Sequence, residues 1–460
     1  MANQTRSDIA VLYRRAGFSL NSTELDQLVL AGYSSAVDGL LSGLGGAPDP
    51  GGNSVPLPNL VTPPPPNKGN LVAIKSYNRA VSAATTDMQR WWMDRMISTS
   101  TPLSEKLTLF WHGHFATSVA KVRNPTLMYM QNLLFRQAGG GSFATLMQEV
   151  AKDGAMMVWL DTISDKKANP NENFAREMME LFTLGVGNYS QQDVVSGARS
   201  FTGWNYNRLV YRYVFDPLQH DFGSKTYLGQ TGNWNGENIV SIATARPESP
   251  RFILAKLWSH FAYPVATTDN VVTDLLGAYG AGMSISGALR AIFLHPAFLG
   301  TTTRTGLVKQ PVEYLAGAAR ALGLNASLTP TNSNASASGS APINTQATTP
   351  TRFGVTLPRI AGALGQKLFD PPNVGGWGQN GYWLDTVTAQ VRLEVGLLLA
   401  RRGDISTVQS APPSQRLDAT ANLLGLDGWG STTAAALNQV TSRPVELVAL
   451  ALASPEYVLA

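Results

Sequence analysis

Two of the five histidines in this 460-residue chain flank a glycine in the segment Trp111-His-Gly-His-Phe115 and are candidate metal ligands. Imidazole nitrogens bind zinc and similar divalent ions. A spacing of two residues would place His112 and His114 on opposite sides of a continuous helix. Gly113, however, is typical of a helix end, beyond which both imidazoles could turn toward one ion. The alternative is that His112 only caps the free carbonyl groups of that helix end.

A polar stripe on an otherwise apolar helix is the second candidate. Asn173, Glu177 and Glu180 recur at helical spacing within the apolar segment 172–184. Buried carboxylates need a cation, hydrogen bonds or a metal, so Glu177 is a candidate ligand or general base and Glu180 a second catalytic carboxylate. Arg176 can pair with Glu172 or stabilise an oxyanion, and Asn173 can contact a substrate. The alternative is a structural network in which an arginine neutralises the glutamates, namely Arg123, Arg176 or Arg199.

The segment from His220 to Lys225 is a compact polar cluster that follows a predicted strand. His220 could be a metal ligand, Asp221 a base and Lys225 a stabiliser of negative charge. The alternative is that Asp221 folds the turn while Lys225 pairs locally. The two remaining histidines, His260 among apolar neighbours and His295 before a proline, favour structural roles.

Tryptophans in Gly/Asn-rich loops are candidate sugar-stacking residues. Trp204 and Trp377 are the two that we assign to substrate binding, although a loop indole can instead anchor its loop to the core. No nucleotide fingerprint accompanies the glycine run 139–141, so we expect neither nucleotide nor flavin. The 35 basic and 31 acidic residues are interspersed, which argues against nucleic-acid binding.

The absence of cysteine excludes disulfides, thiolate metal sites and cysteine nucleophiles. The first residues lack the basic and then apolar regions of a signal peptide, and no apolar run is long enough to span a membrane. These features predict a soluble protein.

The elements that must position the candidate residues follow a helical period. We predict an all-α fold with one small β-hairpin and loop insertion at 205–238, where Leu209–Phe215 alternates as a strand does. The predicted helices are 6–20, 22–42, 72–100, 102–115, 125–137, 142–152, 172–184, 190–202, 250–262, 269–278, 285–294, 310–323, 355–367 and 385–402. The predicted parts are N-terminal helices (1–46), a Pro/Gly-rich connector (47–69), a main helical domain (70–323), a low-complexity mobile loop (324–350) and a C-terminal helical part (351–460).

Six motifs occur in a specific order along the chain. They are Arg14-Arg-Ala-Gly-Phe18, Phe110-Trp-His-Gly-His-Phe115, Asn171-Glu-Asn-Phe-Ala-Arg-Glu177 with Glu180-Leu-Phe-Thr-Leu-Gly185, Ala198-Arg-Ser-Phe-Thr-Gly-Trp204, His220-Asp221 through Gly229, and Pro371-Pro-Asn-Val-Gly-Gly-Trp377. Together they resemble the bacterial family of domain of unknown function 1800, which has no assigned activity. The resemblance implies export and a sulfatase-like partner protein. It also marks Gly113 as a departure, because the family commonly has asparagine between the two histidines.

These observations lead to a hypothesis of a metal-dependent hydrolase acting on a polysaccharide or another extracellular polymer. Its site would gather a divalent ion of unspecified identity and six side chains: His112, His114, Glu177, Glu180, His220 and Asp221. The rival hypothesis is a non-catalytic surface, assembly or glycan-binding protein with a structural buried polar network. A helical metal-dependent oxidase is a further alternative. The discriminating observation is whether the six side chains converge in a pocket or lie apart.

Overall fold

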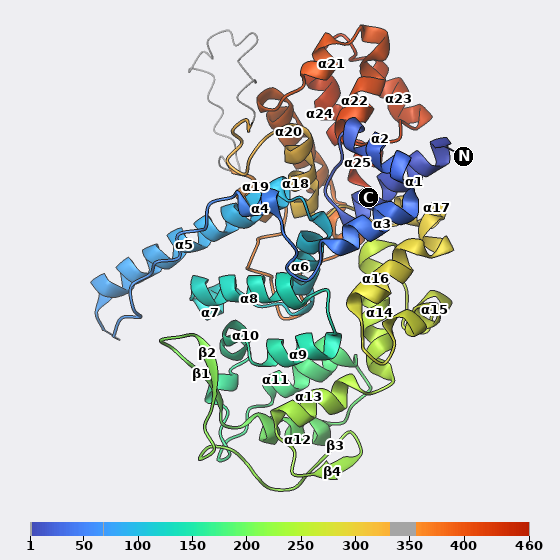
Figure 1. The fold of residues 1–460 in the computed structure, drawn as a ribbon. Coiled ribbons are helices and arrows are strands. Elements are labelled where there is room, and N and C mark those ends of the chain that lie inside the picture. Colours follow the sequence, from blue (N-terminus) through green and yellow to red (C-terminus); the bar gives the residue numbers. More distant parts are fainter. Residues whose placement is uncertain (1, 68, 332–355, 460) are drawn as a thin grey trace.

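The computed structural model describes residues 2–67, 69–331 and 356–459. These residues form an all-α fold with two small antiparallel hairpins, which confirms the predicted fold class (Figure 1). Most of the predicted low-complexity loop lies outside the described residues, and the division into domains stays a prediction. No helix of the described part is long and apolar enough to cross a membrane.

Helix α6 (Pro102–His114) is the central element of the fold, because it is buried along almost its whole length. Figure 1 shows it in the middle of the molecule, with α9, α11, α12 and α13 below and the C-terminal helices above. Leu107 and Trp111 of α6 belong to a core shared with these lower helices, whereas Leu109 belongs to a second core shared with the C-terminal helices. Residues that follow one another on α6 therefore face different parts of the molecule.

Three N-terminal helices cover one side of α6: α1 (Ala2–Ala16), α2 (Ser22–Ala31) and α3 (Tyr33–Ser42). The single helix predicted over 22–42 is wrong, because the chain breaks at Gly32, whose φ of 88° only glycine adopts readily. The N-cap of α2 is Asn21. Asn21 and Glu24 form a reciprocal capping box.

A buried ionic network ties α6 to α5 (Leu71–Ser98) and α8 (Pro125–Ala138). Glu105 of α6 is fully buried and accepts hydrogen bonds from Trp92 Nε1 (2.9 Å), Arg95 Nε (3.1 Å) and Arg136 Nε (2.6 Å). Arg95 also pairs with Asp49, which caps the short helix α4 (Pro50–Asn53). Both oxygens of Glu105 are thus satisfied, as a buried carboxylate requires.

The segment that carries the glutamate stripe begins as α11 (Glu172–Glu177) and continues as a π-helix, η2 (Met178–Thr183). Helix α12 (Gln191–Phe201) follows, with a capping box between Ser190 and Asp193. Single π-turns are frequent at functional sites. Here the π-turn directs the carbonyl groups of Leu181 and Phe182 toward α6 and α14.

The β insertion consists of two hairpins, β1 (Trp204–Asn207) with β2 (Arg212–Phe215) and β3 (Lys225–Tyr227) with β4 (Gln230–Gly232). The strand predicted over Leu209–Phe215 is confirmed for Arg212–Phe215 only, because its first residues form the tip of the first hairpin. The turn residue Tyr211 has a φ of 54°, which fits a tight connection.

The remaining helices have the following bounds: α7 (Val119–Val122), α9 (Phe143–Ala151), α10 (Gly154–Trp159), η1 (Thr162–Ser164), α13 (Gly236–Thr244), α14 (Glu248–Phe261), α15 (Asn270–Tyr279), α16 (Ile285–Leu294), η3 (Pro296–Leu299), α17 (Thr301–Thr305), α18 (Pro311–Ala321), α19 (Leu357–Ala363), η4 (Asn380–Trp383), α20 (Thr386–Arg402), α21 (Ser406–Ser410), η5 (Pro413–Gln415), α22 (Arg416–Leu424), α23 (Ser431–Asn438), α24 (Pro444–Leu452) and α25 (Pro455–Val458).

Candidate functional site

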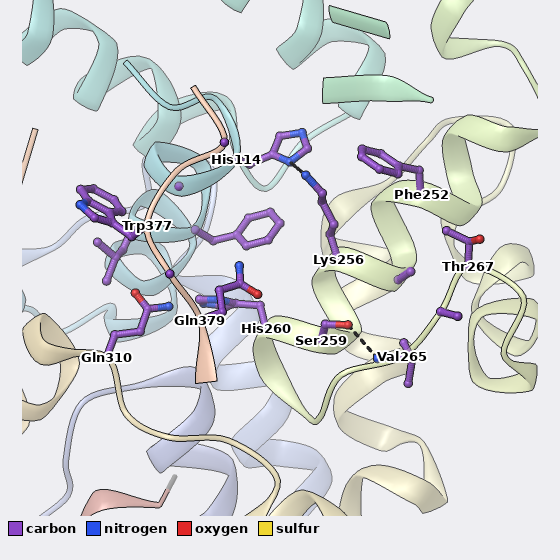
Figure 2. A pocket seen from close by; sticks show the side chains of 17 residues that line it. His114, Phe252, Lys256, Ser259, His260, Val265, Thr267, Gln310, Trp377 and Gln379 are labelled. Carbon is purple, nitrogen blue, oxygen red and sulfur yellow. Dashed lines mark hydrogen bonds between the residues drawn. The ribbon is translucent and has the colours of Figure 1, made fainter. Parts of the chain in front are cut away.

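A cavity of about 340 Å³ lies between the C-terminal half of α6, helix α14 and the loop of residues 375–379. Figure 2 shows side chains from these three elements converging on it. Its apolar wall is formed by Leu109, Phe110, Phe252, Val265 and Trp377. Its polar groups come from His114, Lys256, Ser259, His260, Thr267, Gln310 and Gln379. We call this cavity the α6–α14 pocket.

Two buried polar atoms at the wall of this pocket have no hydrogen-bond partner within the described parts of the chain. They are Nε1 of Trp377 and Nε2 of His260. A buried polar group without a partner costs about 1–3 kcal/mol. Burial lowers the pKa of His260 to about 4, so its imidazole is neutral near pH 7. Both atoms are therefore available to a ligand.

His114 and Lys256 form a polar pair at the inner end of the pocket (Figure 2). Nε2 of His114 lies 3.0 Å from the carbonyl oxygen of Phe182, which can only accept, so Nε2 carries the hydrogen. Nδ1 of His114 then accepts from Lys256 Nζ at 3.3 Å, and Lys256 also donates to Leu181 O at 3.0 Å. Burial, and then the charge of Lys256, holds the pKa of His114 well below its usual value. Burial also lowers the pKa of Lys256 to about 8.

The pocket loop is held against α6 by a close approach of two glycines. Gly376 has a φ of 89°, and a Cβ atom at this position would lie 2.2 Å from the carbonyl oxygen of Gly113. Only glycine fits both the backbone conformation and the space. Trp377, the next residue, is thereby placed over the end of α6, where it is 8% exposed.

His112 lies on the other side of α6 from His114. Its Nε2 is 3.1 Å from Nδ2 of Asn132, and its ring packs among Trp92, Phe135 and Phe369. Burial, and then the charge of Arg136, lowers its pKa to about 3. The expectation that α6 ends at Gly113 and lets both imidazoles turn to one point is wrong, because the helix continues through His114.

The predicted glutamate stripe does not reach the pocket. Arg176 pairs with Glu172 at 2.8 Å, as the spacing of four residues predicts. Glu180 accepts a hydrogen bond from the hydroxyl of Tyr189. Burial, and then the charge of Glu180, raises the pKa of Glu177. The amide of Asn173 donates to Asp161 at 3.3 Å.

The cluster at the β insertion makes its contacts locally. His220 Nδ1 is 2.8 Å from the carbonyl oxygen of Thr202. Asp221 pairs with Arg199 at 2.7 Å, and this hydrogen bond lowers the pKa of the carboxyl group. Lys225 Nζ donates to backbone carbonyl groups, including that of Asp221 at 2.5 Å. These contacts are those of the alternative in which Asp221 and Lys225 fold the turn.

Of the two tryptophans assigned to substrate binding, only Trp377 lines the pocket. Trp204 is 1% exposed and packs edge-on against Phe201 and Tyr213. Lys152 also lies over its ring, at 5.8 Å from the centroid. Trp204 therefore anchors the first hairpin to the core.

The predicted metal ligands are not brought together, because His112 and His114 face opposite sides of α6, Glu177 ends α11 and His220 lies in the loop after β2. The described part of the chain holds no group of three or more histidine, aspartate or glutamate side chains that could bind a metal ion. Zinc sites usually have three or more such ligands, whereas magnesium can bind through one or two carboxylates. The metal centre therefore stays a prediction.

Sequence reasoning missed the polar face of α14. Lys256 and His260 are four residues apart, with Ser259 beside them, so all three lie toward one side of a largely apolar helix. Ser259 Oγ accepts from the backbone N–H of Val265 at 3.1 Å and also lines the pocket. The same stripe argument that singled out Glu177 and Glu180 could have found these residues.

The fold and the site define an all-α protein with a cavity walled by aromatic, amide and basic groups. The chain belongs to the family described as protein of unknown function (DUF1800), whose model matches residues 11–459. Family membership, inferred from the six motifs, is thus confirmed over nearly the whole chain. No curated protein and no solved structure matches it.

Proposed function

We propose that the chain is a glycan-binding protein whose saccharide lies in the α6–α14 pocket. The observation that carries this proposal is the pair of unpartnered buried atoms, Trp377 Nε1 and His260 Nε2, at the wall of an aromatic-lined cavity. The cavity of about 340 Å³ is within the range of roughly 300–1,000 Å³ typical of ligand pockets.

The chemistry of the wall matches that of a sugar. A sugar ring has apolar faces that contact aromatic rings and hydroxyl groups that both donate and accept hydrogen bonds. The pocket offers the rings of Phe110, Phe252 and Trp377. The amide of Gln379 supplies a donor and an acceptor, as hydroxyl groups require, whereas the oxygen of Gln310 already accepts from Gln366 and leaves its NH₂ group as a donor.

Binding is favoured over hydrolysis by the distribution of acidic residues. No residue among those that line the α6–α14 pocket is acidic. Most glycoside hydrolases use two carboxyl groups that flank the scissile bond. Metal-dependent hydrolysis stays a prediction, as do the polymeric substrate and the sulfatase-like partner.

The test is calorimetric titration of the full chain with soluble neutral, acidic and amino-sugar polymers. Gln379→Ala removes one exposed amide and should weaken binding by about 2- to 10-fold, the effect of one hydrogen bond. Gln409→Ala, an exposed glutamine on α21, is the matched control and should bind as the wild type does. A correctly folded wild-type chain that binds none of the three polymer classes would refute the proposal.

A further inference from the structure

A second cavity of about 220 Å³ adjoins the α6–α14 pocket. The two cavities share four lining residues: Ser259, His260, Gln310 and Gln379. A ligand in one cavity can therefore extend into the other. The second cavity is also lined by Arg14 and Arg15 of α1, Lys106 of α6 and Glu313 of α18.

Arg15 is a buried cation whose hydrogen bonds are incomplete. Its side chain donates from Nη2 to the carbonyl oxygen of Thr303, but Nε and Nη1 have no partner among the described residues. The residue is 3% exposed. Burial, and then the charge of Arg14, lowers its pKa to about 9. The carboxylate of Glu313 acts on Arg15 as a counter-charge, but two donors of the guanidinium stay unused, and an anion placed beside them would remove that penalty.

The neighbouring charges leave an excess of positive charge. Arg14, Arg15 and Lys106 line the cavity against one carboxylate, that of Glu313, which gives three positive groups and one negative. Lys106 pairs with Glu313 at 2.8 Å, so this carboxylate already has a partner. Arg14 is held by Asp427 at 3.4 Å through Nη1, while its Nε also lacks a partner in the described chain.

Lys309 does not line the second cavity but interacts electrostatically with the basic residues that do. Its Nζ lies 3.7 Å from the centroid of the Tyr457 ring. Burial, and then the charges of Arg14 and Lys106, holds the pKa of Lys309 well below its usual value. The charge of Arg15 also acts on Lys309 and His260, so these groups share one electrostatic environment.

We propose that the second cavity is an oxyanion subsite that binds the carboxylate, sulfate or phosphate group of an acidic ligand. Nε and Nη1 of Arg15 are the donors, joined by Nε2 of His260 in the tautomer that carries the hydrogen on this atom, because each is buried and unpartnered in the described structure. The identification of the ligand as an acidic saccharide rests on the proposed function, since its sugar ring would occupy the α6–α14 pocket. The anion subsite itself rests only on the geometry of the second cavity.

The first experiment measures thermal unfolding of the full chain in sodium chloride, sulfate, phosphate and glucuronate at equal ionic strength. We expect the oxyanions to raise the melting temperature above that in chloride, because they bind the folded state. Sulfate and phosphate report the inorganic group alone, and glucuronate reports the carboxylate on a sugar ring. Equal melting temperatures in all four salts would overturn the proposal.

The second experiment compares variants by direct titration with the anion that stabilises most. Arg15→Gln should weaken binding by roughly 10- to 100-fold, since hydrogen bonds to charged groups are the stronger ones. Arg290→Gln, which removes an exposed arginine paired with Asp38, is the matched control and should leave binding unchanged. If Arg15→Gln does not fold, His260→Ala, which removes the remaining group assigned to the subsite, provides the comparison. If the cavity variant that folds binds the anion with the same affinity as the wild type, the subsite is refuted.

The two proposals fail separately. Binding of inorganic anions without binding of any saccharide would leave the subsite and refute the glycan-binding function. Binding of neutral saccharides without any response to oxyanions would leave the glycan-binding function and refute the subsite.

Discussion

The contact between Gly376 and Gly113 gives the sharpest prediction about the pocket, because the two glycines should respond to alanine in opposite ways. At Gly376 the added Cβ would lie 2.2 Å from the carbonyl oxygen of Gly113, and the φ of 89° is unfavourable for alanine. At Gly113 the added Cβ would lie 3.8 Å from Cε3 of Trp377, which is an ordinary contact.

The magnitudes follow from these distances. Left-handed backbone costs alanine about 1–2 kcal/mol, and overpacking adds roughly 1–3 kcal/mol. Gly376→Ala should therefore lower the free energy of unfolding by about 2–5 kcal/mol, or displace the loop that carries Trp377. Gly113 lies inside α6, where alanine is more stable than glycine by about 0.5–1 kcal/mol. Gly113→Ala should be neutral or slightly stabilising.

The assay is urea unfolding followed by tryptophan fluorescence, together with saccharide titration of both variants. Gly376→Ala should show the lower urea midpoint and the weaker binding, since Trp377 is the residue that follows it. The reasoning is refuted if Gly376→Ala is as stable as the wild type, or if Gly113→Ala is the more damaging change.

Two further predictions concern the buried network and the expected metal. Glu105→Gln should lower the free energy of unfolding by about 3–5 kcal/mol, because it leaves two buried arginines without their shared carboxylate, whereas Glu172→Gln in the exposed pair should cost less than about 1 kcal/mol. Burial alone would raise the pKa of Glu105, but Arg136 and Arg95 outweigh it and hold the pKa below its usual value. The stability that ionised Glu105 contributes is therefore present above its unfolded-state pKa and lost as the pH falls through its folded-state pKa. Glu105→Gln should reduce this loss of stability at acidic pH, measured as the free energy of unfolding against pH. Elemental analysis of untagged protein should find less than one divalent ion per chain. An equimolar ion that is lost in the Glu177→Gln variant would instead support the hypothesis of a metal-dependent hydrolase.

The fold was predictable because its helices are specified by local features of the sequence. Apolar residues at helical spacing and start signals such as the Ser190–Asp193 box mark most helices to within a few residues. The split at Gly32 was not predictable by the same means, and the sequence left open whether the helix predicted over 102–115 ends at Gly113. Glycine permits both a helix interior and a helix end, and the packing around it decides between them.

The site was only partly predictable, because convergence in space is set by tertiary packing. His114 and Trp377 were identified by residue type and do line the pocket. His112 has the same type and nearly the same position, yet it faces the opposite side of the helix. Arg15 was noticed only as part of a motif, since nothing in the sequence tells a buried unpaired arginine from a paired one.

The contrast between the two sides of α6 explains why the pocket, rather than the buried network, is the place for a ligand. On one side both oxygens of the Glu105 carboxylate accept hydrogen bonds from Trp92, Arg95 and Arg136, so neither is free to bind a ligand. Arg136 Nη1 on this side also lacks a partner in the described chain, but Arg136 lines neither of the two cavities. On the other side His260 and Arg15 have unpartnered buried nitrogen atoms and do line them. Satisfied buried charges stabilise one structure, whereas unsatisfied ones lower stability unless a bound group completes them. Unused buried hydrogen-bonding atoms beside a cavity therefore favour ligand binding at this place.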